Sequence, residues 1–89
     1  MKIVDIIPEN ELKEAVLSES RRKLVIYKLT DERLKKKYGM GFDAFEARDT
    51  VKKNDFSWDV EKDAMEWEHA LEGIKYQQEK IKKLQESDE

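Results

Sequence analysis

Residues Ser57–Gln85 read SWDVEKDAMEWEHALEGIKYQQEKIKKLQ and decide the fold of this chain. Counted in alternating steps of four and three, the stretch holds a continuous line of mostly apolar residues, typical of a helix packed lengthwise against another helix. That line consists of Val60, Ala64, Trp67, Leu71, Ile74, Gln78, Ile81 and Gln85. Ser57 is a suitable N-cap and the stretch lacks proline, so the sequence predicts one long helix over residues 57–86.

A second long helix is predicted over residues 9–38. Pro8 or Asn10 can begin it, and two glutamates in its first turn favour the positive end of the helix dipole. Gly39 suits the left-handed position just past its end. Its apolar face covers an arc of roughly 200°. The residues on that arc are Leu12, Ala15, Val16, Leu17, Leu24, Ile26, Tyr27, Leu34 and Tyr38.

The run Leu24–Leu29 is apolar nearly all round, because Val25 and Leu29 fall outside that arc. One facing helix cannot cover so wide a surface. We therefore expect this run to be buried on two sides, by the other long helix and by something further. The alternative is a strand over the same run, since Val25, Ile26 and Tyr27 all favour β structure.

The connection between the two long helices begins at the Gly39–Gly41 break, and residues 42–53 read as a short helix. Phe42, Phe45 and Val51 are expected to face inward, and Asn54 with Asp55 forms a turn. One interpretation is that the apolar residues of this region plug one end of a helical hairpin, and the other is an exposed aromatic pocket for a partner. The residues concerned are Met40, Phe42, Phe45, Phe56 and Trp58.

The composition fits a single domain of 89 residues with scarce apolar side chains, since 38% are hydrophobic and 44% charged. We expect an all-α antiparallel helical hairpin with a short connecting helix, self-associating into a helical bundle or coiled-coil dimer. Residues 1–7 could form an N-terminal arm or a strand, and residues 87–89 a frayed tail. The chain has no cysteine and no apolar run of membrane-spanning length, so we expect a cytoplasmic protein without membrane contact.

The charges are unevenly distributed. Residues 1–38 hold 10 Lys and Arg against 7 Asp and Glu, a net of +3, whereas residues 39–89 hold 8 against 14, a net of -6. Two oppositely biased helices would attract one another. The other interpretation is that the acidic second half binds a basic partner, or that the basic first half binds nucleic acid. A net charge of +3 alone, however, is too small an excess to support nucleic-acid binding.

No residue pattern indicates catalysis, and we expect no catalytic residue, cofactor or metal. The single histidine, His69, follows Glu66 by three residues, which is half of a carboxylate-bridged di-iron motif. Both residues lie away from the packed line, however, so His69 is expected to face solvent. The acids of the last helix form a solvated face, not a pair held across a cleft.

Several short segments together resemble one group of proteins. They are Lys37-Tyr38-Gly39-Met40-Gly41-Phe42, Phe45-Glu46, Ser57-Trp58-Asp59-Val60-Glu61, Asp63 and Glu66-Trp67-Glu68. Over residues 30–80 they are similar to short archaeal and bacterial proteins that carry KYGMxFxxFE followed by S[WY]xVExDxxxWE. That group is associated with antitoxin-like partners in toxin–antitoxin gene pairs. The resemblance implies a non-catalytic protein that binds and neutralises a partner protein, its cognate toxin.

We therefore expect a protein-interaction module that is not an enzyme and that also self-associates. The candidate partner-binding residues are Leu24, Ile26, Tyr27, Trp58 and Trp67. Two alternatives remain open: a structural self-assembling coiled-coil protein without a toxin partner, and a small DNA-binding regulator.

Overall fold

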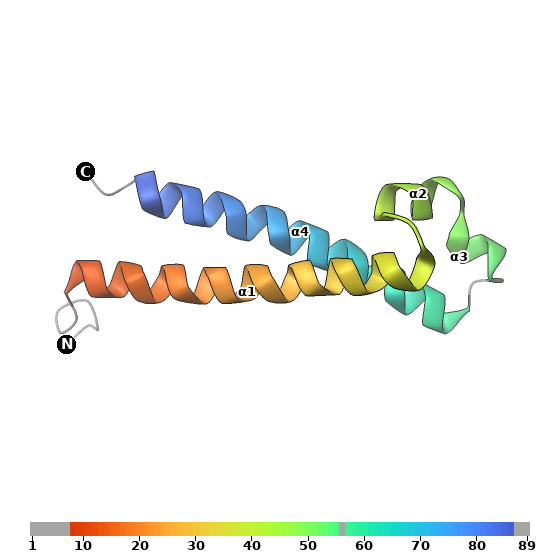
Figure 1. Ribbon diagram of the computed structural model, residues 1–89, viewed down its shortest axis with the longest axis horizontal. Coiled ribbons are helices and arrows are strands. Elements are labelled where there is room, and N and C mark those ends of the chain that lie inside the picture. The colour runs from red at the N-terminus through yellow and green to blue at the C-terminus, as the bar shows by residue number, and fades with distance from the viewer. Residues whose placement is uncertain (1–7, 56, 87–89) are drawn as a thin grey trace.

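The computed structural model describes residues 8–55 and 57–86, and this part of the chain contains helices and no strand. The helices are α1 (Glu9–Tyr38), α2 (Phe42–Ala47), α3 (Thr50–Lys53) and α4 (Trp58–Glu86). Figure 1 shows α1 and α4 as two long arms that run in opposite directions, with α2 and α3 at the closed end. The molecule measures 55 × 26 × 16 Å. The expected all-α antiparallel hairpin is confirmed.

Helix α1 has the bounds that the sequence predicts. The Pro8 carbonyl accepts a hydrogen bond from the Leu12 N–H at 3.0 Å, so the helix begins directly after the proline, and Asn10 lies inside the first turn. Gly39 has a φ of +67° and donates its N–H to the Lys35 carbonyl at 2.8 Å. This left-handed residue ends the helix, because residues with a Cβ rarely adopt that conformation.

The connector differs from its prediction, because residues 42–53 form two short helices and not one. Asp49 adopts a left-handed conformation with a φ of 51°, which breaks the helix between α2 and α3. The Thr50 hydroxyl then donates to the Phe45 carbonyl at 2.8 Å and satisfies an acceptor at the end of α2. Aspartate tolerates the left-handed region better than most residues, so this bend is compatible with the local sequence.

The hydrophobic core lies at the closed end of the hairpin. Leu34, Phe45 and Trp67 are each at most 1% exposed and come from α1, α2 and α4. Partly buried residues packed against them are Tyr38, Met40, Phe42, Val51, Val60, Ala64 and Leu71. The plug is thus confirmed for three of its members, Met40, Phe42 and Phe45. It is wrong for Trp58, which is 64% exposed because it lies on the side of α4 opposite the buried residues. Phe56 lies outside the described residues.

The packed line of α4 departs from the predicted one in its second half. Gln78 and Gln85 are exposed, and the buried residues of the helix are Asp63, Trp67, Ala70 and Gln77. From Trp67 onward the line therefore continues in steps of three and four, not four and three. Asp63 and Gln77 carry polar groups and Ala70 is small, so hydrophobicity alone does not reveal them.

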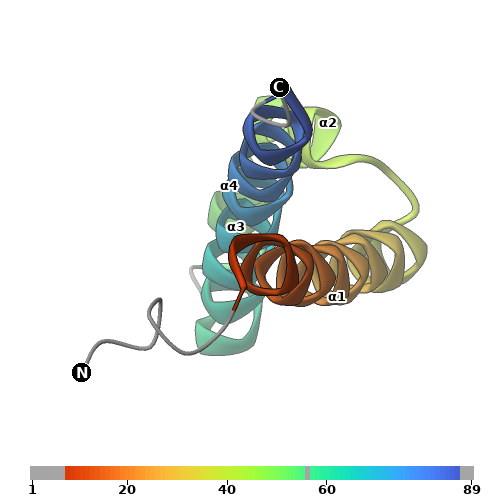
Figure 2. The ribbon, with the colours of Figure 1, turned by 90° about the vertical axis from the view of Figure 1, so that its left-hand side faces the viewer.

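Helix α1 contradicts the expectation that Leu24–Leu29 is buried on two sides. Leu24 and Tyr27 are half-buried, whereas Val25, Ile26 and Leu29 are 46–64% exposed. The run is helical, so the alternative of a strand is also wrong. The physical reason is coverage: α4 packs along one side of α1, and the connector packs at the far end of the hairpin. Figure 2, viewed along the hairpin, shows α4 on one side of α1.

Candidate functional site

The closed end of the hairpin contains a buried carboxylate. Asp63 is 7% exposed, and its Oδ2 accepts hydrogen bonds from the Tyr38 hydroxyl at 2.6 Å and the Lys37 ammonium at 2.5 Å. Burial by itself would raise the pKa of Asp63, but these hydrogen bonds and the positive charges of Lys37 and Arg33 outweigh it and lower that pKa. Burial and the neighbouring carboxylate raise the pKa of Tyr38 to about 12. The arrangement keeps Asp63 charged and joins α1 to α4.

Trp67 is the central residue of the same end and is fully buried. Its indole N–H donates to Asp31 Oδ1 at 2.8 Å, and Asp31 Oδ2 lies 3.2 Å from the Lys35 ammonium. The ring also packs against Phe42 and Phe45, with centroids 5.3 and 5.2 Å apart. The ring is thus packed and its N–H is hydrogen-bonded inside the chain, so Trp67 has a structural role.

Midway along the hairpin the Tyr27 ring of α1 packs against α4 at Gly73. A Cβ placed there would lie 2.5 Å from Cε2 of Tyr27, which is closer than side chains pack. The Tyr27 ring also meets His69 edge-on, with the ring centroids 5.7 Å apart. Glycine at this position therefore allows the α1 tyrosine to lie across α4. His69 is exposed as predicted.

Glu66, three residues before His69, is engaged by the other long helix. Glu66 accepts a hydrogen bond from Arg33 at 2.7 Å and so forms an ion pair between the two long helices. Within residues 8–55 and 57–86, no group of three or more metal-ligating side chains is close enough to hold an ion. The Glu66 carboxylate instead serves to align α4 with α1.

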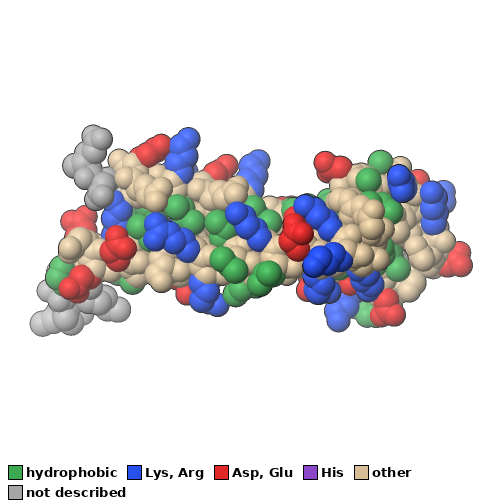
Figure 3. Space-filling model, in the orientation of Figure 1, with side chains coloured by type: hydrophobic (Ala, Val, Ile, Leu, Met, Phe, Trp, Pro, Cys, Tyr) green, Lys and Arg blue, Asp and Glu red, His purple; other side chains and the backbone are tan. Residues whose placement is uncertain are grey.

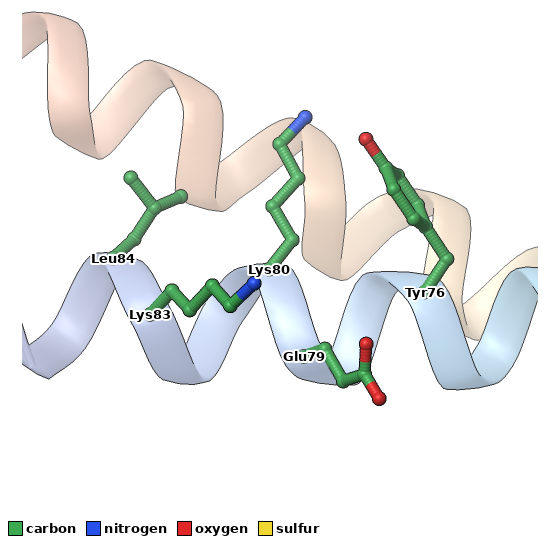
Figure 4. Close-up of a pocket in the computed structure, with 5 residues that line it drawn as sticks. All are labelled: Tyr76, Glu79, Lys80, Lys83 and Leu84. Atoms are coloured by element: carbon green, nitrogen blue, oxygen red, sulfur yellow. The ribbon is translucent and has the colours of Figure 1, made fainter.

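The described residues line at least two open hollows on the surface. One, of about 370 Å³, is lined by Tyr76, Glu79, Lys80, Lys83 and Leu84, all from α4. Figure 4 shows Tyr76, Lys80 and Leu84 extending from the same side of α4. The Lys80 ammonium lies 5.9 Å from the centroid of the Tyr76 ring, a cation–π distance.

The second hollow, of about 460 Å³, lies beside the connector. Its lining residues are Phe45, Glu46, Asp49, Thr50, Val51, Lys52 and Ala64. The apolar floor belongs to the core cluster described above, and the polar lining mixes both signs of charge. The hollow is thus a surface recess of the connector.

Large apolar side chains emerge along the outer face of α4. Trp58 is 64% exposed, Met65 55% and Tyr76 60%. Met65 follows Trp58 by seven residues, and Tyr76 follows Met65 by eleven. Both spacings return to nearly the same side of a helix, so the three side chains form one line, here called the α4 stripe. Acids surround its first half and form no ion pair with any described residue. These acids are Asp59, Glu61, Glu68 and Glu72.

A second apolar surface lies on α1 and consists of Val25, Ile26 and Leu29, here called the α1 patch. Figure 3 shows hydrophobic side chains at the surface midway along this helix. Basic residues lie on both sides of the patch in the sequence, and three of them, Arg21, Lys28 and Lys36, pair with no acid among the described residues. The two apolar surfaces of the molecule therefore differ in charge: the α1 patch is basic and the α4 stripe is acidic.

The predicted partner-binding residues divide between surface and interior. Ile26 and Trp58 are exposed, and Leu24 and Tyr27 lie half-buried between the long helices. Trp67 has no exposed surface.

Sequence reasoning did not single out the other exposed apolar residues, Val25, Leu29, Met65 and Tyr76, as contacts. A usable signal existed for Met65, which follows Trp58 by seven residues on the face opposite the packed line.

Comparison with protein-family models, with curated proteins and with solved structures gave no match for this chain. None of the helices in the described part of the chain has the length and apolar character that crossing a membrane requires.

Proposed function

We propose that this chain is a non-catalytic, antitoxin-like interaction module that binds a basic partner protein through the α4 stripe and neutralises it by binding. The observation that carries the proposal is the exposure of Trp58 and Met65, 64% and 55%, on the helix face opposite the packed line. Tryptophan is enriched among the few residues that dominate protein–protein binding energy. An exposed tryptophan aligned with an exposed methionine is therefore a strong candidate for the centre of an interface.

The two segments that carry the resemblance pack against each other, which accounts for most of their residues. Tyr38 bonds Asp63, and Phe42 and Phe45 pack on Trp67. Trp58 belongs to the same pattern but takes no such place in the core. Core packing explains the buried residues and leaves the aromatic residue at position 58 to be explained by a contact outside this chain.

The charge around the α4 stripe sets the class of partner. Asp59, Glu61, Glu68 and Glu72 are acids without an ion partner in the described residues, and residues 39–89 carry a net charge of -6. Complementary charge accelerates association and disfavours wrong partners. The partner surface is therefore basic, with an apolar groove that receives Trp58 and Met65 in the manner of a helix bound in a groove.

The stripe is also held in place before binding. Asp63 and Trp67, which lie within the same part of α4, are anchored to α1 by hydrogen bonds. A partner that binds a packed helix does not have to order it first, so less of the interaction free energy is lost on binding. This preorganisation supports a role as a rigid binding surface.

Co-expression of the full chain with the protein encoded by the adjacent gene tests the proposal. We expect the two to co-purify, and the complex to relieve any growth inhibition that the neighbour causes alone. Glu68→Lys with Glu72→Lys should abolish co-purification, whereas the matched control Glu14→Lys on α1 should not. Failure of the unmodified chain to retain its neighbour would contradict the antitoxin-like function.

A further inference from the structure

The outer face of α1 has a charge pattern that reverses about its centre. Arg22, Val25, Leu29 and Glu32 follow one another at steps of three, four and three, so they lie on one line of the helix. All four are exposed, with Val25 at 56% and Leu29 at 64%. The line thus has two apolar residues at its centre, a cation at one end and an anion at the other.

From this pattern we infer that a second copy of the chain covers the α1 patch, with the two α1 helices antiparallel about a two-fold axis near Tyr27. That symmetry places Val25 of each copy against Leu29 of the other. It also places Arg22 of each copy against Glu32 of the other, because these residues are equally far from the centre. A surface that is complementary to itself is what a two-fold homodimer requires.

The same axis accounts for the neighbouring residues on one edge of the line. Ile26, which is 46% exposed, would meet Ile26 of the second copy. A parallel arrangement would instead set Arg22 against Arg22 and Glu32 against Glu32. Charge therefore selects the antiparallel orientation.

Existing contacts of these charged residues do not prevent the pairing. Arg22 bonds Glu19 at 2.6 Å, and Glu32 lies 3.7 Å from Lys35, in both cases within one exposed helix. Exposed ion pairs within one helix are weak, so Arg22 and Glu32 can exchange these partners for residues of the second copy. The other edge of the line carries the basic residues Arg21 and Lys28. In the dimer these residues of the two copies would repel one another, which opposes association.

This inference uses a different surface from the α4 stripe, so it holds or fails independently of the proposed function. Sedimentation equilibrium of the full chain should give a dimer that dissociates on dilution. Arg22→Glu and Glu32→Arg, made singly, should each weaken the dimer at least about tenfold, because each sets like charges together at two places. The double variant restores both pairs with reversed sign and should recover most of the affinity.

Cysteine cross-linking tests the register, since the natural chain has no cysteine. A mixture of the Val25→Cys and Leu29→Cys variants should form a mixed disulfide faster than either variant forms one with itself. Circular dichroism of every variant checks that the exposed substitutions leave the helices intact.

A chain that stays monomeric at all concentrations, or a double charge reversal that fails to restore the dimer, would overturn the inference. So would faster cross-linking of Leu29→Cys with itself, which indicates a parallel pair. Loss of the dimer on Met65→Glu but not on Leu29→Glu would also overturn it, because that result places the interface on α4.

Discussion

The Tyr38 hydroxyl lies 2.6 Å from Oδ2 of Asp63 and donates a hydrogen bond to it across the interface of α1 and α4. This contact places a carboxylate of α4 directly against α1. On the same helix, Trp67 packs against the connector and Trp58 is exposed to solvent. One buried polar pair thus connects the packing of the hairpin to the surface that it presents.

Acid should destabilise the fold through Asp63. Burial alone would raise its pKa, but the hydrogen bonds from Lys37 and Tyr38 prevail and lower it, so the folded chain binds fewer protons than the unfolded chain. The stabilising contribution is then complete above the unfolded pKa of about 4 and is lost as pH falls through the folded pKa. Urea unfolding at a series of pH values should show a shallower acid dependence for Asp63→Asn than for the natural chain.

The matched control for that series is Asp59→Asn, an exposed residue of the same helix, which should leave the acid dependence unchanged. Equal pH profiles for the natural chain and Asp63→Asn would show that this carboxylate is not held in its charged form by the fold.

The two tryptophans should respond oppositely to truncation. Trp67 is fully buried, so Trp67→Ala should lower the free energy of unfolding by about 3–5 kcal/mol. Trp58→Ala removes an exposed ring and should change it by no more than about 0.5 kcal/mol. Chemical unfolding followed by circular dichroism measures both values. A large loss for Trp58→Ala would assign that ring to the core and remove it from the proposed interface.

Much of this fold follows from sequence because its signals are local. Gly39 and Pro8 mark the ends of α1 through their backbone chemistry, and the helix has the predicted bounds. The packed line of α4 was predicted correctly at Trp67 but not at Gln78, because Gln77 is the buried neighbour. Two adjacent glutamines look alike in sequence, and only the position of α1 decides which one it covers.

The surface could be predicted less well, for a related reason. The width of the apolar face of α1 correctly indicates that one helix cannot cover it, but Val25 and Leu29 remain exposed because the chain supplies no second cover among its described residues. Trp58 was assigned both to the plug and to partner binding. Which role applies depends on how α4 is rotated against α1, and tertiary contacts, not the local sequence, set that rotation.

Gly73 should resist replacement by alanine despite its helical position. Alanine favours a helix interior by about 1 kcal/mol over glycine, but its Cβ would lie 2.5 Å from the Tyr27 ring. We therefore expect Gly73→Ala to give no gain in the natural chain and a gain of about 1 kcal/mol in a Tyr27→Ala background. A double-mutant cycle from thermal unfolding measures this coupling, and additive effects would show that the ring does not limit the site.

Replacing Gln77 should stabilise the chain. The residue is 4% exposed, and its buried Oε1 accepts no hydrogen bond in the described part of the chain. An unpaired buried polar group costs about 1–3 kcal/mol, so Gln77→Leu should raise the free energy of unfolding by an amount in that range. Gln78→Leu, at the adjacent exposed position, is the control and should have little effect. Destabilisation by Gln77→Leu would mean that the amide makes a contact the fold needs.

Isothermal titration of the full chain with the protein encoded by the adjacent gene tests the central claim most directly. We expect saturable binding that weakens with salt and that Trp58→Ala weakens by about 30-fold, the equivalent of roughly 2 kcal/mol. Val25→Ala, on the opposite helix, should bind as the natural chain does. Absence of binding, or equal affinities for Trp58→Ala and the natural chain, would contradict a function exerted through the α4 stripe.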